Sequence, residues 1–378
     1  MSFPQIPVFD LRLEEDDVQA VLDVYRSGWL TMGPRTAEFE RAFAEHLGAK
    51  HAVAVSSCTA ALHLAYLAAG VGPGDEVIVP AMTFAATAAA VVYCGATPVF
   101  ADVLGPHDLA LDPEDVAAKI TPRTKAVTVV HFAGYPAAVK ALRALTDAHG
   151  LALIEDVAHA PCATVDGRAL GTFGLAGAFS FFSNKVLACG EGGLMATDDD
   201  DVAALARSLR SQGMTSGTWS RHTGETETYD AVGMGFNYRL DEPRSALLLS
   251  RLSKLPRGVS RRRELTRAYR VRLRDVPGVI VPYDDASVEH STCYVLPILL
   301  EDASRRNDVR TTLRDGGVQT SIFYPAVHEF TAYRERFGTP SLPRTEYVAR
   351  AEITLPLHLD MDEAVIDRVV SALAEALR

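Results

Sequence analysis

The chain has 378 residues, of which 48% are hydrophobic and 22% are charged, as in a folded globular protein rather than a disordered one. Its 48 acidic residues outnumber its 37 basic residues, which gives a net charge of −11 and argues against a nucleic-acid partner. A chain of this length predicts two domains.

The cysteines and the longest uncharged stretch indicate in which cellular compartment the protein works. That stretch, residues 81–101, has about the length of a membrane span, but Gly95 and Pro98 interrupt it, so we expect a buried helix followed by a strand. The N-terminus lacks the pattern of a secretion signal. No C-x-x-C pair, HExxH motif or histidine cluster is present, so we expect neither disulfides nor a metal site, no membrane association, and a cytoplasmic location. The five scattered cysteines are Cys58, Cys94, Cys162, Cys189 and Cys293.

Apolar strands alternate with helical patterns through the first two-thirds of the chain. Near-continuous runs of Val, Ile, Leu and Ala, separated by helices, predict an α/β fold with a mostly parallel sheet covered on both faces. In chain order we expect a strand at 51–57, a helix at 59–70, a strand at 75–80, a helix at 84–95, strands at 97–103 and 124–132, a helix at 137–150, and strands at 150–157 and 177–183.

The character of the sequence changes after residue 252. A basic helical stretch, residues 261–275, leads into an apolar segment at residues 293–300 and a final helix at residues 362–378. We therefore predict a large domain over residues 1–245 and a smaller C-terminal domain over residues 246–378.

Several strand ends carry polar residues. Asp156 lies at the end of one predicted strand, and Ser180 and Lys185 lie at the end of another. Residues 56–59, Ser-Ser-Cys-Thr, join a third strand to a helix. In an open α/β sheet, ligands bind beyond the carboxyl ends of the strands. Ser or Thr at a helix start is by default an ordinary N-cap, but the same helix end offers free N–H groups to a phosphate.

Together these groups match the requirements of pyridoxal 5′-phosphate (PLP). This cofactor needs a lysine for its Schiff base, an acid beside its pyridine nitrogen and a cradle for its phosphate. A lysine is rarely found in apolar surroundings unless it is paired, loses its charge or is used chemically. The alternative for Lys185 and Asp156 is a buried ion pair, and the sequence favours the cofactor.

Six ordered segments carry a family signal: GPRTAEFERAFAEHLGAKHAVAVSSCTAALHLA, GVGPGDEVIVPAMTFAATAAAVVYCGATPVFADV, ITPRTKAV, LIEDVAHA, FSFFSNKVLACGEGG and GFNYRLDE. In these segments, and over essentially its whole length, the chain resembles the DegT/DnrJ/EryC1/StrS family of PLP-dependent sugar aminotransferases. The resemblance implies aminotransferase fold type I, with a large PLP-binding domain and a smaller C-terminal α/β domain. It also implies a homodimer whose active sites are shared between subunits.

The resemblance also implies roles for individual residues. Lys185 matches the Schiff-base lysine, and Asp156 matches the partner of the pyridine nitrogen. His159, where many relatives have Gln, would approach the phenolic oxygen of the cofactor. Phe84 would stack on the ring, and Asn237 would reach the phosphate bound by the other subunit.

The phosphate itself would be held by Ser180 together with Cys58 and Thr59 at a helix start. Each of these side chains also has an ordinary structural explanation. Its place in a family motif is the reason for assigning it a functional role. The commonest family motif has Gly where this chain has Cys58. We therefore expect the loop to persist, with its contact geometry open and with a reactive thiol near the cofactor.

The resemblance implies amino transfer from glutamate, which leaves as 2-oxoglutarate, to a ketosugar. The most similar branch acts on nucleotide-linked 4-ketosugars, so we expect a TDP- or UDP-4-keto-(6-deoxy)sugar and a role in amino-sugar or natural-product biosynthesis. A 3-ketosugar, a cyclitol ketone such as an inosose, and a non-catalytic sensor remain alternatives. Candidate substrate contacts, equally compatible with other roles, are His131, Arg221, Arg239, Tyr324 and His328.

Overall fold

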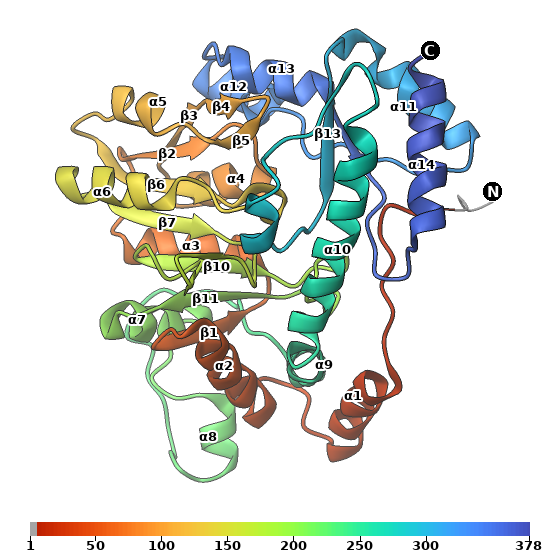
Figure 1. Ribbon diagram of the computed structural model, residues 1–378. Helices are drawn as coiled ribbons and strands as arrows, with labels where there is room; N and C mark the ends of the chain where they lie inside the picture. The colour runs from red at the N-terminus through yellow and green to blue at the C-terminus, as the bar shows by residue number, and fades with distance from the viewer. Residues whose placement is uncertain (1–5) are drawn as a thin grey trace.

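The computed structural model describes residues 6–378 and places a seven-stranded sheet at its centre, with the strand order β1-β11-β10-β7-β6-β2-β3 (Figure 1). β11 runs antiparallel to both of its neighbours, and all other adjacent strands are parallel. The predicted α/β class with a mostly parallel sheet is confirmed. The strands are β1 (His51–Val55), β2 (Glu76–Pro80), β3 (Thr97–Ala101), β6 (Thr124–Val130), β7 (Ala152–Asp156), β10 (Ala176–Ser180) and β11 (Gly193–Thr197).

Helices cover both faces of this sheet because its strands are apolar on both sides. Successive strand side chains point to opposite faces, so Val53 and Val55 pack into one core and Ala52 and Ala54 into the other. The first core is covered by α3 (Cys58–Ala68), α4 (Ala85–Tyr93) and α7 (Asp200–Arg210). The second is covered by α2 (Pro34–Leu47), α6 (Val139–His149) and α9 (Glu242–Leu252).

The C-terminal part of the chain builds a second, smaller layer around an antiparallel sheet of order β12-β13-β14. The long helix α10 belongs to both parts, because Leu255 packs into a core of the seven-stranded sheet and Tyr269 into the core of the C-terminal part. The predicted boundary after residue 245 falls inside α9 and stays a prediction. The elements of this part are α10 (Leu255–Leu273), β12 (Val279–Ile280), β13 (Leu296–Leu300), α11 (Arg306–Asp315), α12 (Thr331–Phe337), α13 (Pro343–Ala351), β14 (Glu352–Leu355) and α14 (Glu363–Ala376).

An N-terminal arm, residues 6–14, connects the two parts. It runs beside the C-terminal part and leads to α1 (Glu15–Ser27) at the far end of the molecule (Figure 1). Val8 N donates a 3.0 Å hydrogen bond to Gln319 Oε1, which ties the arm down. The remaining short elements are β4 (Val103–Gly105), β5 (Asp108–Leu111), α5 (Pro113–Ala118), η1 (Phe132–Gly134), β8 (Thr164–Val165), β9 (Arg168–Ala169), α8 (Thr218–His222), η2 (Ser287–His290), η3 (Ala303–Arg305) and η4 (Val327–Glu329).

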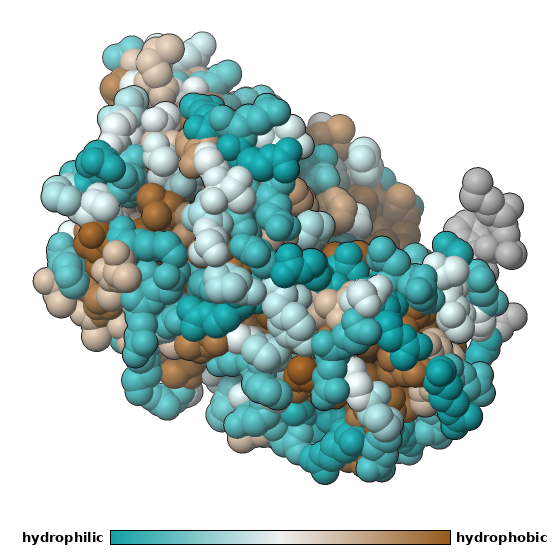
Figure 2. All heavy atoms as spheres, turned by 90° about the horizontal axis from the view of Figure 1, so that it is seen from above, coloured by the Kyte–Doolittle hydropathy of each residue, from teal (hydrophilic) through white to brown (hydrophobic). Residues whose placement is uncertain are grey.

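The surface is mixed in character. Seen from above, hydrophilic residues alternate with small hydrophobic groups (Figure 2). The uncharged stretch at residues 81–101 forms α4 and β3, as predicted. Among residues 6–378, no helix combines the length and apolar character that crossing a membrane requires.

Candidate active site

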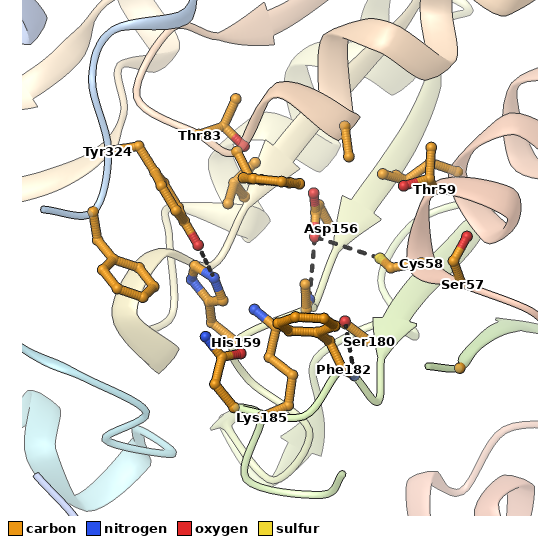
Figure 3. Close-up of a pocket in the computed structure, with 18 of the residues that line it drawn as sticks. Ser57, Cys58, Thr59, Thr83, Asp156, His159, Ser180, Phe182, Lys185 and Tyr324 are labelled. Carbon is orange, nitrogen blue, oxygen red and sulfur yellow. Dashed lines mark hydrogen bonds between the residues drawn. The ribbon is translucent and has the colours of Figure 1, made fainter. Parts of the chain in front are cut away.

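A cavity of about 310 Å³ lies where the carboxyl ends of the parallel strands meet. Asp156 enters it from the end of β7 and Ser180 from the end of β10, while Tyr324 comes from the C-terminal part. Figure 3 shows Lys185, His159 and Tyr324 on one side of this cavity and Ser57, Cys58 and Thr59 on the other, with Asp156 between them. The predicted convergence of lysine, acid and helix start is therefore present in the structure.

The N-terminus of α3 forms one wall of the cavity. Ser57 is the N-cap and accepts a 3.1 Å hydrogen bond from Ala60 N, while Cys58 and Thr59 form the first turn. Gly193 of β11 lies directly against this turn, since a Cβ there would come within 2.2 Å of the Ser57 carbonyl carbon. The free N–H groups and positive dipole end of such a helix suit a phosphate.

Asp156 is almost completely buried at the end of β7. Its carboxylate accepts hydrogen bonds from Thr87 Oγ1 at 2.8 Å and Ala158 N at 3.1 Å, and Cys58 Sγ lies 4.0 Å away. Burial nevertheless raises the pKa of Asp156, against these hydrogen bonds and the positive charge of Lys185. A protonated ring nitrogen in the cavity would supply the partner that this carboxylate lacks.

Lys185 follows β10 and lines the same cavity. Burial lowers the pKa of its amine to about 8, although Cys58 and Asp156 act in the opposite direction. Its Nζ lies 4.5 Å from the centre of the Tyr294 ring. Within residues 6–378 no ion pair involves Lys185, so the alternative of a salt bridge to Asp156 is not supported.

His159 and Tyr324 form a hydrogen-bonded pair, with 3.1 Å between His159 Nε2 and the Tyr324 hydroxyl. Burial and the nearby Lys185 lower the pKa of His159 well below its ordinary value, so the ring is neutral. Its Nδ1 is buried and has no partner among the described residues. Phe84, which is 59% exposed, lies beside Tyr324 with 5.6 Å between the ring centres.

These features fit PLP. One cavity is lined by three groups that this cofactor needs. They are the Lys185 amine, which has no ion pair within residues 6–378, the buried Asp156 carboxylate, which needs a positive partner, and the open N-terminus of α3. The buried Asn184 Oδ1 at the same cavity also lacks a partner within the described part of the chain. Ser180 lies beside these groups, and its Oγ accepts a long 3.5 Å hydrogen bond from Phe182 N.

Two of the predicted substrate contacts are buried away from this cavity. His131 Nε2 lies 3.2 Å from Glu155 Oε2 and its Nδ1 accepts a hydrogen bond from Ala137 N, so its ring belongs to an internal network. His328 is fully buried, and its Nε2 lies 3.8 Å from Glu346 Oε1. Both rings are fully buried by other parts of the chain, and neither lines the cavity. Of the predicted substrate contacts, only Tyr324 lines it.

The other predicted residues outside the cavity lie nearer the surface. Arg221 donates to the Ser216 carbonyl at 2.7 Å and packs 4.4 Å above the Tyr229 ring, in the segment that contains α8. Asn237 is exposed and Arg239 is half-buried. Asn237 is predicted to act in a second subunit and the two arginines to contact the substrate, and all three roles stay predictions.

Some site residues were not anticipated from the sequence. Thr87, the hydrogen-bond donor to Asp156, is also 2.7 Å from Thr83, and the spacing of these threonines around Phe84 in TFAAT was the available signal. Tyr294 comes from the C-terminal part and carries no local signal. Burial raises the pKa of Cys58 well above its ordinary value, which argues against the expected reactivity of this thiol.

Comparisons with known proteins agree with this site. A model of the "DegT/DnrJ/EryC1/StrS aminotransferase family" matches residues 11–374. The chain is 38% identical over 370 residues to the spore coat polysaccharide biosynthesis protein SpsC of Bacillus subtilis, covering 96% of this chain and 95% of SpsC.

Two solved structures extend the likeness to the fold. The aminotransferase TlmJ of Streptoalloteichus hindustanus has a TM-score of 0.91 at 37% identity, covering 98% of each chain. DesV of S. venezuelae, solved in complex with a ketimine intermediate, has a TM-score of 0.90 at 36% identity, covering 99% of each chain. The chain therefore belongs to the DegT/DnrJ/EryC1/StrS family and is a PLP-dependent sugar aminotransferase of the predicted aminotransferase fold.

Proposed function

We propose that the chain transfers the amino group of glutamate to a nucleotide-linked ketosugar, a TDP- or UDP-4-keto-(6-deoxy)sugar, and works as a cytoplasmic homodimer. The observation that carries amino transfer is the half-buried Lys185, free of any ion pair within residues 6–378, in one cavity with Asp156 and the start of α3. Five free cysteines are consistent with a reducing compartment.

The choice of a saccharide acceptor is supported by the relatives. SpsC is named for polysaccharide biosynthesis, and this chain covers nearly its whole length. The cavity of about 310 Å³ is small for a nucleotide sugar in addition to a cofactor. We therefore place the sugar ring near Tyr324 and the nucleotide outside this cavity, toward the partner subunit.

In this proposal the chain's own groups hold the cofactor and move the protons. PLP, when bound, stabilises the electron pair left on the substrate carbon that loses a proton. Asp156 holds the positive charge at the ring nitrogen, and the N–H groups of Cys58 and Thr59 bind the phosphate. Lys185 Nζ, with a pKa of about 8, takes the proton from the α-carbon of glutamate as a general base.

The second half of the reaction uses the same groups in reverse order. Glutamate leaves as 2-oxoglutarate, and the ketosugar takes up the amino group, so that one amine and one carbonyl are exchanged. Lys185 Nζ then delivers the proton to the sugar carbon that carried the carbonyl. Asn237, Arg239 and Arg221 would complete the site of the partner subunit. His131 and His328 are left out of the proposed substrate site, because both rings are buried away from this cavity.

The absorbance spectrum of the PLP-loaded protein tests amino transfer. We expect glutamate to change the visible absorbance of bound PLP and to yield 2-oxoglutarate, and Lys185→Ala to lose this turnover by a factor of about 10³ or more. Lys140→Ala, at an exposed position of α6, is the matched control and should behave like the wild type. A spectrum that glutamate leaves unchanged would contradict glutamate as the donor.

The acceptor is tested separately, with TDP- and UDP-linked 4-ketosugars beside a 3-ketosugar and an inosose. The expected result is turnover of a nucleotide-linked 4-ketosugar, with the new amine at carbon 4 by NMR spectroscopy. Preferential turnover of the 3-ketosugar or the inosose would overturn the proposed substrate and leave the aminotransferase activity standing.

A further inference from the structure

Three potential metal ligands meet where the N-terminal arm crosses the segment after β14. Asp10 belongs to the arm, and His358 and Asp360 follow β14. One ligand atom from each side chain lies within 4.8 Å of the others. Asp10 lies far in the sequence from His358 and Asp360, so no local motif joins the three residues and no metal site was predicted.

His358 points to a ligand independently of the two carboxylates. Its side chain is only 8% exposed, yet neither ring nitrogen has a hydrogen-bond partner within the described part of the chain. Buried polar groups are normally paired, so an imidazole with two unpartnered nitrogens calls for an explanation.

We propose that Asp10, His358 and Asp360 bind a divalent transition-metal ion, with Zn²⁺ as the best match. An imidazole and two carboxylates are ligands that Zn²⁺ accepts, and water would complete the coordination. Bonds of about 2.0–2.2 Å bring ligand atoms closer together than 4.8 Å. Asp10 and Asp360 are exposed and can rotate to close this gap, while the buried His358 stays in place.

Arg12 occupies the same pair of carboxylates. Its Nε lies 2.8 Å from Asp360 Oδ2 and 3.2 Å from Asp10 Oδ2, so this position already attracts a cation. The Arg12 side chain is 72% exposed and can move into water without losing packing. The metal ion and the guanidinium would therefore compete for these two carboxylates. Removing the guanidinium should then tighten the binding of the metal ion.

The ion would fasten the arm beside the catalytic lysine. A second cavity, of about 610 Å³, is lined by Phe9 and Asp10 of the arm, by Asp360, and by Lys185 itself. The nearest backbone tie of the arm is the 3.3 Å hydrogen bond from Leu357 N to the Val8 carbonyl. A metal bridge from Asp10 to His358 and Asp360 would hold the part of the arm that follows Val8. It would thereby hold one wall of this cavity in place.

The test is calorimetric titration of Zn²⁺ into the full-length, PLP-loaded protein after treatment with a chelator. We expect one Zn²⁺ per chain and a rise in Tm with added Zn²⁺. His358→Gln and Asp360→Asn should each weaken binding by about tenfold or more, and Arg12→Gln should tighten it. Asp360 is exposed, so its variant keeps the test valid even if His358→Gln fails to fold.

Cys162 and His46 are the rival site, since Cys162 Sγ lies 3.4 Å from His46 Nε2. Cys162→Ser should therefore leave the Zn²⁺ titration unchanged. Binding that survives both His358→Gln and Asp360→Asn, or that disappears in Cys162→Ser, would overturn the proposal. The absence of any Zn²⁺ binding to the wild type and to Arg12→Gln would overturn it as well. Because the readout is binding of Zn²⁺, its result is independent of the proposed sugar substrate.

Discussion

At the scale of single residues, Glu352 is a buried acid that holds the segment next to the active-site cavity. Its side chain is completely buried at the start of β14, and its Oε2 accepts a 2.8 Å hydrogen bond from Phe323 N. The next residue, Tyr324, lines the cavity. Burial raises the pKa of Glu352 to about 8, although hydrogen bonds from Thr354 and Phe323 N and two nearby arginines favour the carboxylate.

This raised pKa predicts a stability that falls as the pH rises. Between about pH 4.5 and pH 8 the folded chain keeps a proton on Glu352 that the unfolded chain has lost, so each pH unit lowers the free energy of unfolding by about 1.4 kcal/mol at most. Below pH 4.5 both states are protonated and the contribution is complete. Glu352→Gln should abolish this part of the pH dependence, measured by urea unfolding at several pH values.

A surface glutamate provides the control for this measurement. Glu335→Gln, at an exposed position of α12, should leave the pH dependence of wild-type unfolding as it is. If Glu352→Gln keeps the full slope between pH 5 and pH 8, another group causes the pH dependence and the prediction for Glu352 is refuted.

At the scale of elements, the start of α3 has two roles. Ser57 caps the helix, and the first turn faces the proposed phosphate position. Ser57→Ala removes the hydroxyl that accepts from Ala60 N, which should cost about 1 kcal/mol of stability. It also loosens the turn that carries the N–H groups of Cys58 and Thr59. Loss of one charge-assisted hydrogen bond should raise the dissociation constant of PLP by roughly tenfold, measured by equilibrium dialysis.

Asp199→Ala is the matched change, because Asp199 caps α7 by accepting from Asp201 N and Val202 N, and it is not among the residues that line the cavity. It should cost similar stability while leaving PLP affinity unchanged. Equal losses of PLP affinity in both variants would mean that the cap acts only through global stability.

Elements and sites differ in how far the sequence predicts them. The strands that end at Val55 and Asp156 were predictable because their residues are apolar on both faces, and their ends place the start of α3 and Asp156 at one edge of the sheet. His131 follows a strand in the same way, but its ring turns to Glu155 instead, and the direction of one side chain is set by packing across the sheet. The contact between Lys185 and Tyr294 joins two parts of the chain that no local pattern relates.

At the scale of the whole molecule, Asn237 bears on the predicted assembly. It lies in an exposed segment, and its backbone pairs with that of Ser211. It is also not among the residues that line the cavity holding Lys185. If Asn237 contributes to catalysis, it must therefore do so in a neighbouring subunit. A shared site of this kind makes the predicted homodimer a requirement for activity, and size-exclusion chromatography with light scattering should find a dimer.

Mixing two inactive variants separates a shared site from a self-contained one. In a mixed dimer of Lys185→Ala and Asn237→Ala subunits, one site receives both substitutions, while the other has an intact Lys185 and an intact Asn237 from the neighbour. Random exchange of subunits makes half of the dimers mixed, so about a quarter of all sites, and roughly a quarter of wild-type activity, should return. Sites built within one chain would never regain an intact pair, so a mixture no more active than its parts would refute the shared site.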